Sequence, residues 1–182
     1  MNRAATASRM RRQNHRGQRI ATIRPLAPSD HAEVLRINAG GRPGVAPLDA
    51  AELDRLCSLD GTHLVADAGG GALAGYVLAF AHGCLYDGEE FQYFRAQLRR
   101  PFLYVDQLAI DPARQRSGLG AALYAALIDE ARAQRLELLC CEVNTAPPNP
   151  ASLQFHLRLG FRVAGNGDTL DGRRAMFLTR SV

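Results

Sequence analysis

The sequence predicts one domain with a mixed α/β fold, in which a central sheet carries helices on its faces. Segments with strand-like patterns alternate with segments of helical periodicity along most of the chain. The 182 residues are enough for one hydrophobic core and few for two. Hydrophobic residues make up 47% and charged residues 22%, which is typical of globular proteins. The expected element order is βααβββαβαββ, with about seven strands and about four helices.

A strand and two helices are predicted at the start of this domain. Residues 19–26, RIATIRPL, alternate between apolar and polar side chains as a strand does. Asp30 and Glu33 form a D-x-x-E start signal for a helix that ends at a glycine pair. Asp49 and Glu52 repeat the signal for a second, shorter helix.

The middle of the chain predicts a β-hairpin followed by a long connection. Residues 62–81 contain two strand-like runs around three consecutive glycines. The alternation of strand and helix patterns stops at residues 82–101. This stretch contains acidic and aromatic side chains, and no regular element is expected in it. This connection is either a packed excursion with its own small core or a wall or lid over a substrate pocket.

The last part predicts alternating strands and helices. A strand over 102–110 precedes a helix over 117–134, and a strand over 136–143 precedes a helix over 150–159. A final hairpin follows, with its turn expected at 166–168. Its outer strand offers an exposed edge at which two copies of the chain could pair as a homodimer.

Charge argues against a nucleic-acid-binding domain. The net charge of +4 comes from six arginines that precede residue 20, and the remaining residues carry 16 basic against 18 acidic side chains. Residues 1–18 are interpreted as a disordered arginine-rich leader, and 19–182 as the single domain. A polyanion-binding arm is the alternative for the leader.

Other function classes are excluded by simple features. No apolar run reaches the roughly 20 residues of a membrane span, so no membrane partner and a cytoplasmic location are expected. The four cysteines lack the CxxC spacing of zinc sites and are interpreted as reduced core residues, so no metal is expected.

The stretch RQRSGLGAALY, residues 114–124, predicts an anion site. A helix N-terminus presents unpaired N–H groups and a partial positive charge, and glycines let a ligand approach the backbone. Gly118 and Gly120 lie where the loop after a strand becomes a helix. No Walker lysine follows, and the dinucleotide pattern G-x-G-x-x-G is absent. Taken alone, the pair of glycines could equally serve only the turn.

This stretch resembles the Q/R-x-x-G-x-G/A signature of the GNAT superfamily of acyl-CoA N-acyltransferases. A second stretch, NPASLQFHLRLGF, resembles that family's N-x-x-A-x-x-F-Y-x-x-x-G-F segment, with Ser152 in the alanine place and His156 in the tyrosine place. The chain is therefore similar to GNAT members, uncharacterised bacterial ones included. The resemblance implies acetyl-CoA as co-substrate, held by residues that match the two motifs and the strand before them: Leu108, Ala109, Ile110, Gln115, Arg116, Ser117, Gly118, Leu119, Gly120, Ala121, Asn149, Ser152 and Phe155.

Amide formation from a thioester needs a base, donors for the oxyanion and an acid for the leaving thiolate. Two carboxylates compete as base. Glu142 follows an apolar run, at a place where some family members carry a glutamate. Asp106 lies in an apolar strand with the parity of Leu108 and Ile110, although pairing with an arginine of the 82–101 connection would also explain it.

The resemblance implies backbone N–H donors around 108–110 for the oxyanion, and a tyrosine acid that His156 replaces. An imidazole can donate a proton near neutral pH. Alternatively, His156 caps the interface between helix and sheet or orders the thiol sulfur.

The predicted function is N-acetyltransfer from acetyl-CoA to a primary amine of a small molecule or peptide, by direct attack in a ternary complex. The alternatives are an inactive acyl-CoA sensor and an acyltransferase that uses longer acyl groups.

Overall fold

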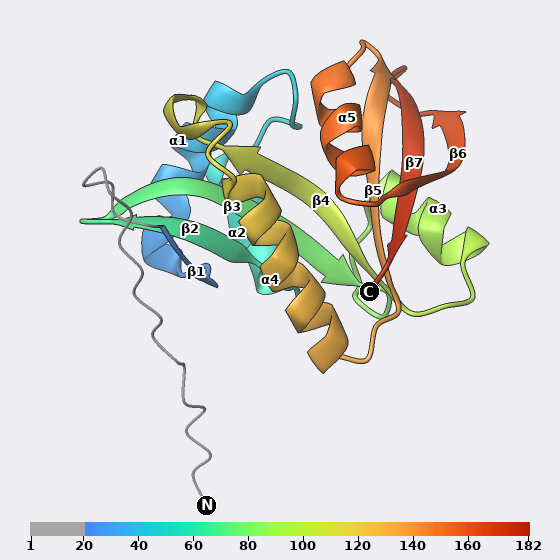
Figure 1. The fold of residues 1–182 in the computed structure, drawn as a ribbon, viewed down its shortest axis with the longest axis horizontal. Helices are drawn as coiled ribbons and strands as arrows, with labels where there is room; N and C mark the ends of the chain where they lie inside the picture. Colours follow the sequence, from blue (N-terminus) through green and yellow to red (C-terminus); the bar gives the residue numbers. More distant parts are fainter. Residues whose placement is uncertain (1–20) are drawn as a thin grey trace, which may run out of the picture.

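The computed structural model describes residues 21–182, which form a seven-stranded sheet with five α-helices (Figure 1). The strand order is β1-β2-β3-β4-β5-β7-β6. The mixed fold predicted from the sequence is confirmed. The strands are β1 (Thr22–Pro25), β2 (Leu64–Gly69), β3 (Ala72–Ala81), β4 (Phe102–Ile110), β5 (Leu138–Ala146), β6 (Arg162–Asp168) and β7 (Arg174–Ser181). The helices are α1 (His31–Gly41), α2 (Ala50–Ser58), α3 (Glu89–Gln97), α4 (Leu119–Ala133) and α5 (Pro150–Arg158), with 3-10 turns at Pro28–Asp30 and Pro112–Arg114.

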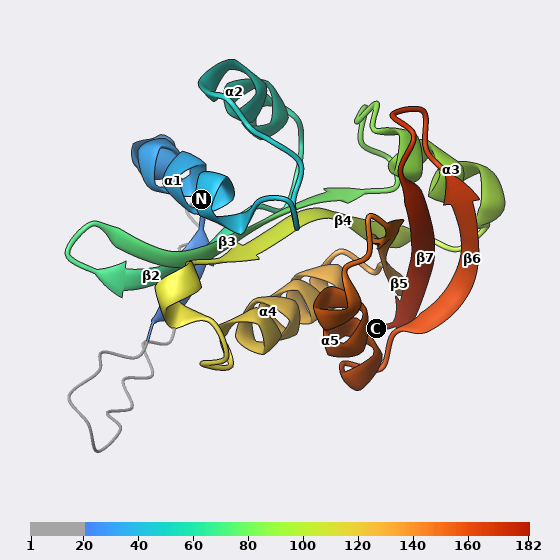
Figure 2. The same cartoon turned by 90° about the horizontal axis from the view of Figure 1, so that it is seen from above.

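Helices cover both faces of the sheet (Figure 2). Helices α1, α2 and α3 pack on one face, where apolar side chains such as Ile37, Leu53 and Phe94 form one core cluster. Helices α4 and α5 pack on the other face, where Leu123 and Leu127 belong to a second cluster. Strands β3, β4 and β5 therefore bury side chains in both directions, which explains the nearly continuous apolar runs of β3 and β5.

The centre of the sheet splits between β4 and β5. These two strands are parallel, and their paired residues are 102–104 with 138–140. Beyond these pairs β4 and β5 diverge, whereas β5 continues to pair with β7 up to residue 146 (Figure 1). The divergence opens a gap in the sheet at the ends of both strands.

A β-bulge lies in β4 where the strands begin to diverge. Val105 pairs with Ala79 and Gln107 pairs with Leu78, so Asp106 is the extra residue. The bulge reverses the alternation, and Tyr104 belongs to the first core cluster whereas Leu108 packs against the second. The parity that places Asp106 with Leu108 and Ile110 is therefore wrong, because a bulge inserts a residue that alternation does not count.

Two local predictions are corrected. The 82–101 connection contains helix α3, which begins after Gly88 and buries Phe91 and Phe94 one turn apart, so residues 21–182 contain five α-helices and not four. Residues 166–168 belong to β6, and the turn of the last hairpin comes after Asp168. The glycines at 165 and 167 suggested a turn, but both extend beside Phe177. The leader 1–18 and residues 19–20 lie outside the described residues.

All four cysteines are free, and Cys84, Cys140 and Cys141 are buried. Within residues 21–182, no three His, Cys, Asp or Glu side chains are grouped so that they could hold a metal ion. In the same part of the chain, none of the helices has the length and apolar composition needed to cross a membrane.

Candidate active site

A cavity of about 1050 Å³ lies where β4 and β5 diverge. Residues 105–108 of β4 and 141–144 of β5 line it, together with the start of α4, parts of α5 and the segment that follows α1. The sequence therefore brings its two motifs to a single space between the two halves of the sheet. The lining differs in charge and composition from one side to the other.

The loop before α4 forms one side of the cavity. Asp111 accepts a hydrogen bond from the N–H of Ala113 (2.9 Å) and so caps the 3-10 turn that follows β4. Arg116 and Gly118 then adopt left-handed backbone angles, with φ of 60° and 84°. Successive N–H groups in such a turn, and those of a first helical turn, have no intrahelical acceptor and favour an anion. We call residues 114–121 the anion loop.

Gly120 is needed for the packing of α4 against α5. A Cβ atom at Gly120 would come within 2.9 Å of the Phe155 ring. Asn149 caps α5 by accepting a hydrogen bond from the N–H of Ser152 (3.2 Å). The two sequence motifs are therefore in direct contact, and together they form the anion side of the cavity.

Nearly all residues predicted to bind the co-substrate line the cavity. The exception is Ala109, whose side chain is buried in the first core cluster on the far side of β4. The predicted residues that line the cavity are Leu108, Ile110, Gln115, Arg116, Ser117, Gly118, Leu119, Gly120, Ala121, Asn149, Ser152 and Phe155.

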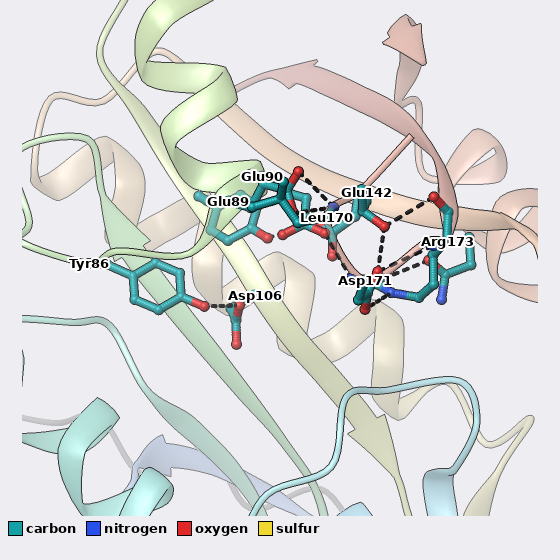
Figure 3. A network of polar contacts seen from close by, with 11 residues as sticks. Tyr86, Glu89, Glu90, Asp106, Glu142, Leu170, Asp171 and Arg173 are labelled. Carbon is teal, nitrogen blue, oxygen red and sulfur yellow. Dashed lines mark hydrogen bonds and ion pairs between the residues drawn. The ribbon is translucent and has the colours of Figure 1, made fainter. Parts of the chain in front are cut away.

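The opposite side of the cavity carries two carboxylates held by tyrosines. Asp106 accepts a hydrogen bond from the Tyr86 hydroxyl (2.5 Å), and Glu142 accepts one from the Tyr104 hydroxyl (2.8 Å). Figure 3 shows Tyr86 aimed at Asp106. The partner of Asp106 does come from the 82–101 connection, but it is a tyrosine and not an arginine.

Both carboxyl groups have raised pKa values. Desolvation raises the pKa of Glu142 to about 8, and the negative charges of Glu90 and Asp106 add to the shift. Desolvation also raises the pKa of Asp106 to about 6, although the hydrogen bond from Tyr86 opposes the shift. Both groups therefore exchange protons near neutral pH, which an exposed carboxyl group does not do.

An ion-pair cluster forms the rim beside these carboxylates. Arg173 contacts Glu90 (3.0 Å), Asp171 (2.6 Å) and the side-chain oxygen of Asn144 (2.8 Å). The N–H of Leu170 donates to Glu89 (2.9 Å), which ties the β6–β7 turn to the start of α3 (Figure 3). We call the residues Tyr86, Glu90, Asp106, Glu142, Asp171 and Arg173 the acidic side of the cavity.

His156 lines the cavity with both ring nitrogens in contact with protein groups. Its Nδ1 lies 2.8 Å from the carbonyl oxygen of Ser152, so Nδ1 carries the proton that this carbonyl accepts. Its Nε2 lies 2.7 Å from the Tyr124 hydroxyl, which donates to it. Desolvation lowers the pKa of His156, so the neutral imidazole is favoured.

Sequence reasoning missed several side chains of this site, among them Tyr104, Tyr124 and Arg173. Tyr104 and Tyr124 stand in apolar runs and were counted as strand and core residues, and Arg173 looked like an ordinary residue of a hairpin. All three line the cavity or hold a side chain that does. A hydroxyl within an apolar run needs a partner when it is buried, and this is the signal that could have indicated Tyr104 and Tyr124.

Residues 34–161 match the family model described as the acetyltransferase (GNAT) family. A search of curated proteins gave no match. Among solved structures, the ribosomal-protein-S18-alanine N-acetyltransferase from Escherichia coli has a TM-score of 0.67 at 21% identity, over 90% of this chain and 94% of that one.

Two further structures contain bound acetyl-CoA. The phosphinothricin acetyltransferase from Sinorhizobium meliloti has a TM-score of 0.66 at 21% identity, over 90% of this chain and 89% of that one. Arabidopsis thaliana NAA60 has a TM-score of 0.69 at 15% identity, over 88% of this chain and 99% of that one. At these identities the likeness shows a shared fold.

Proposed function

The chain belongs to the GNAT acetyltransferase family, and on that premise we propose that it transfers the acetyl group of acetyl-CoA to a primary amine of a small molecule or peptide. The observation that supports this most strongly is the composition of the cavity. One side is an anion loop at a helix N-terminus, and the other side carries Glu142 and Asp106, whose pKa values are raised. A phosphate-bearing thioester and an amine thus have separate places in one space.

The residues of the anion loop fit the diphosphate of coenzyme A. The left-handed turn at Gly118 presents backbone N–H groups, and Arg114 and Arg116 add positive charge. Acetyl-CoA supplies an acetyl group activated as a thioester. The N–H groups of β4 near Leu108 and Ile110 are the proposed hydrogen-bond donors to the carbonyl oxygen, because β4 has left its partner β5 at these residues.

Glu142 is the proposed general base. A base works best when its pKa lies near the working pH, and the pKa of Glu142 is about 8. The Tyr104 hydroxyl fixes one of its oxygens and leaves the other free to accept a proton from the amine. Asp106, with a pKa of about 6, is the weaker base and is the second candidate for this role.

His156 and Tyr124 are proposed to act together on the departing thiolate. Neutral His156 gives its only N–H to a backbone carbonyl, and Tyr124 donates its hydroxyl proton to Nε2. A thiolate can receive the Tyr124 proton if the hydroxyl turns from Nε2 to the sulfur, although burial raises the pKa of Tyr124 and makes it a weak acid. His156 then orients this hydroxyl. If turnover remains intact in His156→Phe, the histidine has no part in the reaction.

The charge of the acidic side supports a cationic acceptor. Four carboxylates face one arginine there, and that arginine is already paired with Glu90 and Asp171. A negative lining of this kind raises the local concentration of ammonium groups. An amine approaches as the ammonium ion and then loses its proton to Glu142.

The test is calorimetric titration with acetyl-CoA, followed by an assay of released thiol with a panel of amino acids, aminoglycosides, polyamines and short peptides. Micromolar binding together with thiol release is expected. The control is Glu137→Gln, which changes an exposed glutamate that directly precedes β5. Binding without release on every amine would favour the sensor, and release only with longer acyl-CoA would favour the other acyltransferase.

A further inference from the structure

The segment between α1 and α2 forms a wall of the cavity with little hydrogen bonding of its own. Residues 42–48 all line the cavity, and we call them the wall segment. Pro43 and Pro47 have no N–H group. Among the described residues, one backbone–backbone hydrogen bond involves residues 43–48. It runs from the N–H of Gly44 to the carbonyl oxygen of Gly41 (2.9 Å). Another part of the molecule must therefore fix its position.

The side chain of Asn38 does this with both ends of its amide. Its Nδ2 donates to the carbonyl oxygen of Ala46 (2.9 Å), and its Oδ1 accepts from the N–H of Leu48 (3.0 Å). These are the two backbone groups that a neighbouring β-strand would contact. Asn38 is fully buried in the last part of α1, so water does not compete for these bonds.

The same amide also reaches β4. Asn38 Nδ2 lies 3.0 Å from Gln107 Oε1 and 3.0 Å from the Tyr76 hydroxyl, which itself donates to Gln107 Oε1 (2.9 Å). All three side chains are buried. Gln107 directly follows the bulge residue Asp106. The network therefore joins the wall segment to the point in β4 where the two halves of the sheet part.

We propose that Asn38 is a positioning residue, which holds residues 42–48 against β4 and thereby sets the width of the cavity for the acceptor amine. Buried hydrogen bonds that join in one network favour a single arrangement of their side chains. Asn38 does not line the cavity, so its effect passes through the wall segment.

The test compares Asn38→Ala with two controls. Val34→Ala removes fully buried atoms from α1 and leaves the network in place. Tyr76→Phe removes a hydroxyl of the network but leaves both bonds from Asn38 to the wall segment. The measurement is amide hydrogen exchange of the full chain at Leu48. We expect exchange to rise at least about tenfold in Asn38→Ala, compared with each control.

The kinetic measurement rests on the proposed function and uses the panel amine with the highest turnover. In Asn38→Ala the KM for this amine is expected to rise about tenfold, with kcat within about threefold of the wild type. The Kd for acetyl-CoA, measured by titration, is expected to stay within about threefold, because the anion loop is unchanged. A merely structural loss would instead affect Asn38→Ala and Val34→Ala alike.

Two results would overturn the proposal. One is equal exchange at Leu48 in Asn38→Ala and Val34→Ala, and the other is faster exchange with an unchanged KM for the amine. If the wild type turns over no amine, the proposed function fails, and the exchange comparison alone decides whether Asn38 holds the wall segment.

Discussion

The two sides of the cavity are built in different ways. The anion loop comes from consecutive residues, and the role proposed for it depends on backbone groups and on the absence of side chains at two glycines. The acidic side comes from residues of β4, β5, α3, the loop before α3 and the β6–β7 turn, which are far apart in the sequence. Its function depends on side-chain carboxylates and on hydroxyl groups that hold them.

This difference has a consequence for change by mutation. A backbone cradle tolerates many substitutions at its non-glycine positions, because every residue except proline supplies an N–H. The acidic side depends on its individual side chains, because the charges of Glu90 and Asp106 add to the raised pKa of Glu142. Binding of the common co-substrate and choice of acceptor can therefore vary independently.

Glu142→Gln is expected to have the largest effect on the rate, and to change the acidic side of the cavity without changing the anion loop. Loss of a general base lowers rates by about 10²- to 10⁴-fold. The change leaves the anion loop untouched, so kcat/KM should fall by this amount while the Kd for acetyl-CoA stays the same. Thiol-release kinetics and titration measure the two quantities. Equal loss in Glu137→Gln, or loss of acetyl-CoA binding in Glu142→Gln, would contradict the division.

The pH dependence tests the same carboxylate without a permanent change. Because the pKa of Glu142 is about 8, its ionised fraction falls about tenfold per pH unit below that value. A base acts only when ionised, so kcat/KM should rise about 50-fold from pH 6 to 8 and about twofold more above pH 8, where it levels off. Glu142→Gln provides the reference that removes the titration of the amine itself. An inflection that persists unchanged in this variant would assign it to another group.

A smaller effect on the other side of the cavity is expected for Gly118→Ala. A left-handed residue with a Cβ costs roughly 1–2 kcal/mol, which corresponds to about 5- to 30-fold in affinity if the loop shifts to relieve it. Gly71 in the β2–β3 turn also has φ of 84° and open space around it, and it does not line the cavity. Gly71→Ala should lose similar stability without weaker acetyl-CoA binding. Equal affinities in both variants would show that the loop does not hold the co-substrate.

The smallest effect is expected for Arg173→Gln. Without this arginine Glu90 loses a positive partner, and the charge of Glu90 raises the pKa of Glu142. The inflection of the pH–rate profile should therefore move upward by about half a pH unit. Arg174→Gln is the matched control, because Arg174 is the next residue and pairs with exposed Asp168. A downward shift, or the same shift in the control, would contradict the effect.

The fold was predictable because its signals are local. The strand 102–110 and the helix over 150–159 were predicted within one residue of their observed bounds, since apolar runs and start signals mark them. Helix α3 was missed because short acidic and aromatic stretches resemble loops. The last turn was misplaced because two glycines within a strand resemble a turn.

The site was predictable in one half. A motif of adjacent residues identified the anion loop, and Glu142, Asp106 and His156 do line the same cavity. The hydrogen bonds to Tyr86, Tyr104 and Tyr124 join residues 20, 38 and 32 positions apart. No pattern in one sequence encodes such contacts, and the bulge at Asp106 defeats counting along the strand.

The short pairing between β4 and β5 gives the molecule a mechanical character. The two halves of the sheet, β1–β4 and β5–β7, are joined there by three residue pairs, so this junction can act as a hinge. A ligand bound between β4 and β5 contacts both halves of the sheet and restrains their movement about the hinge. Its binding should therefore stiffen the whole molecule against bending, and the departure of the ligand should loosen it again.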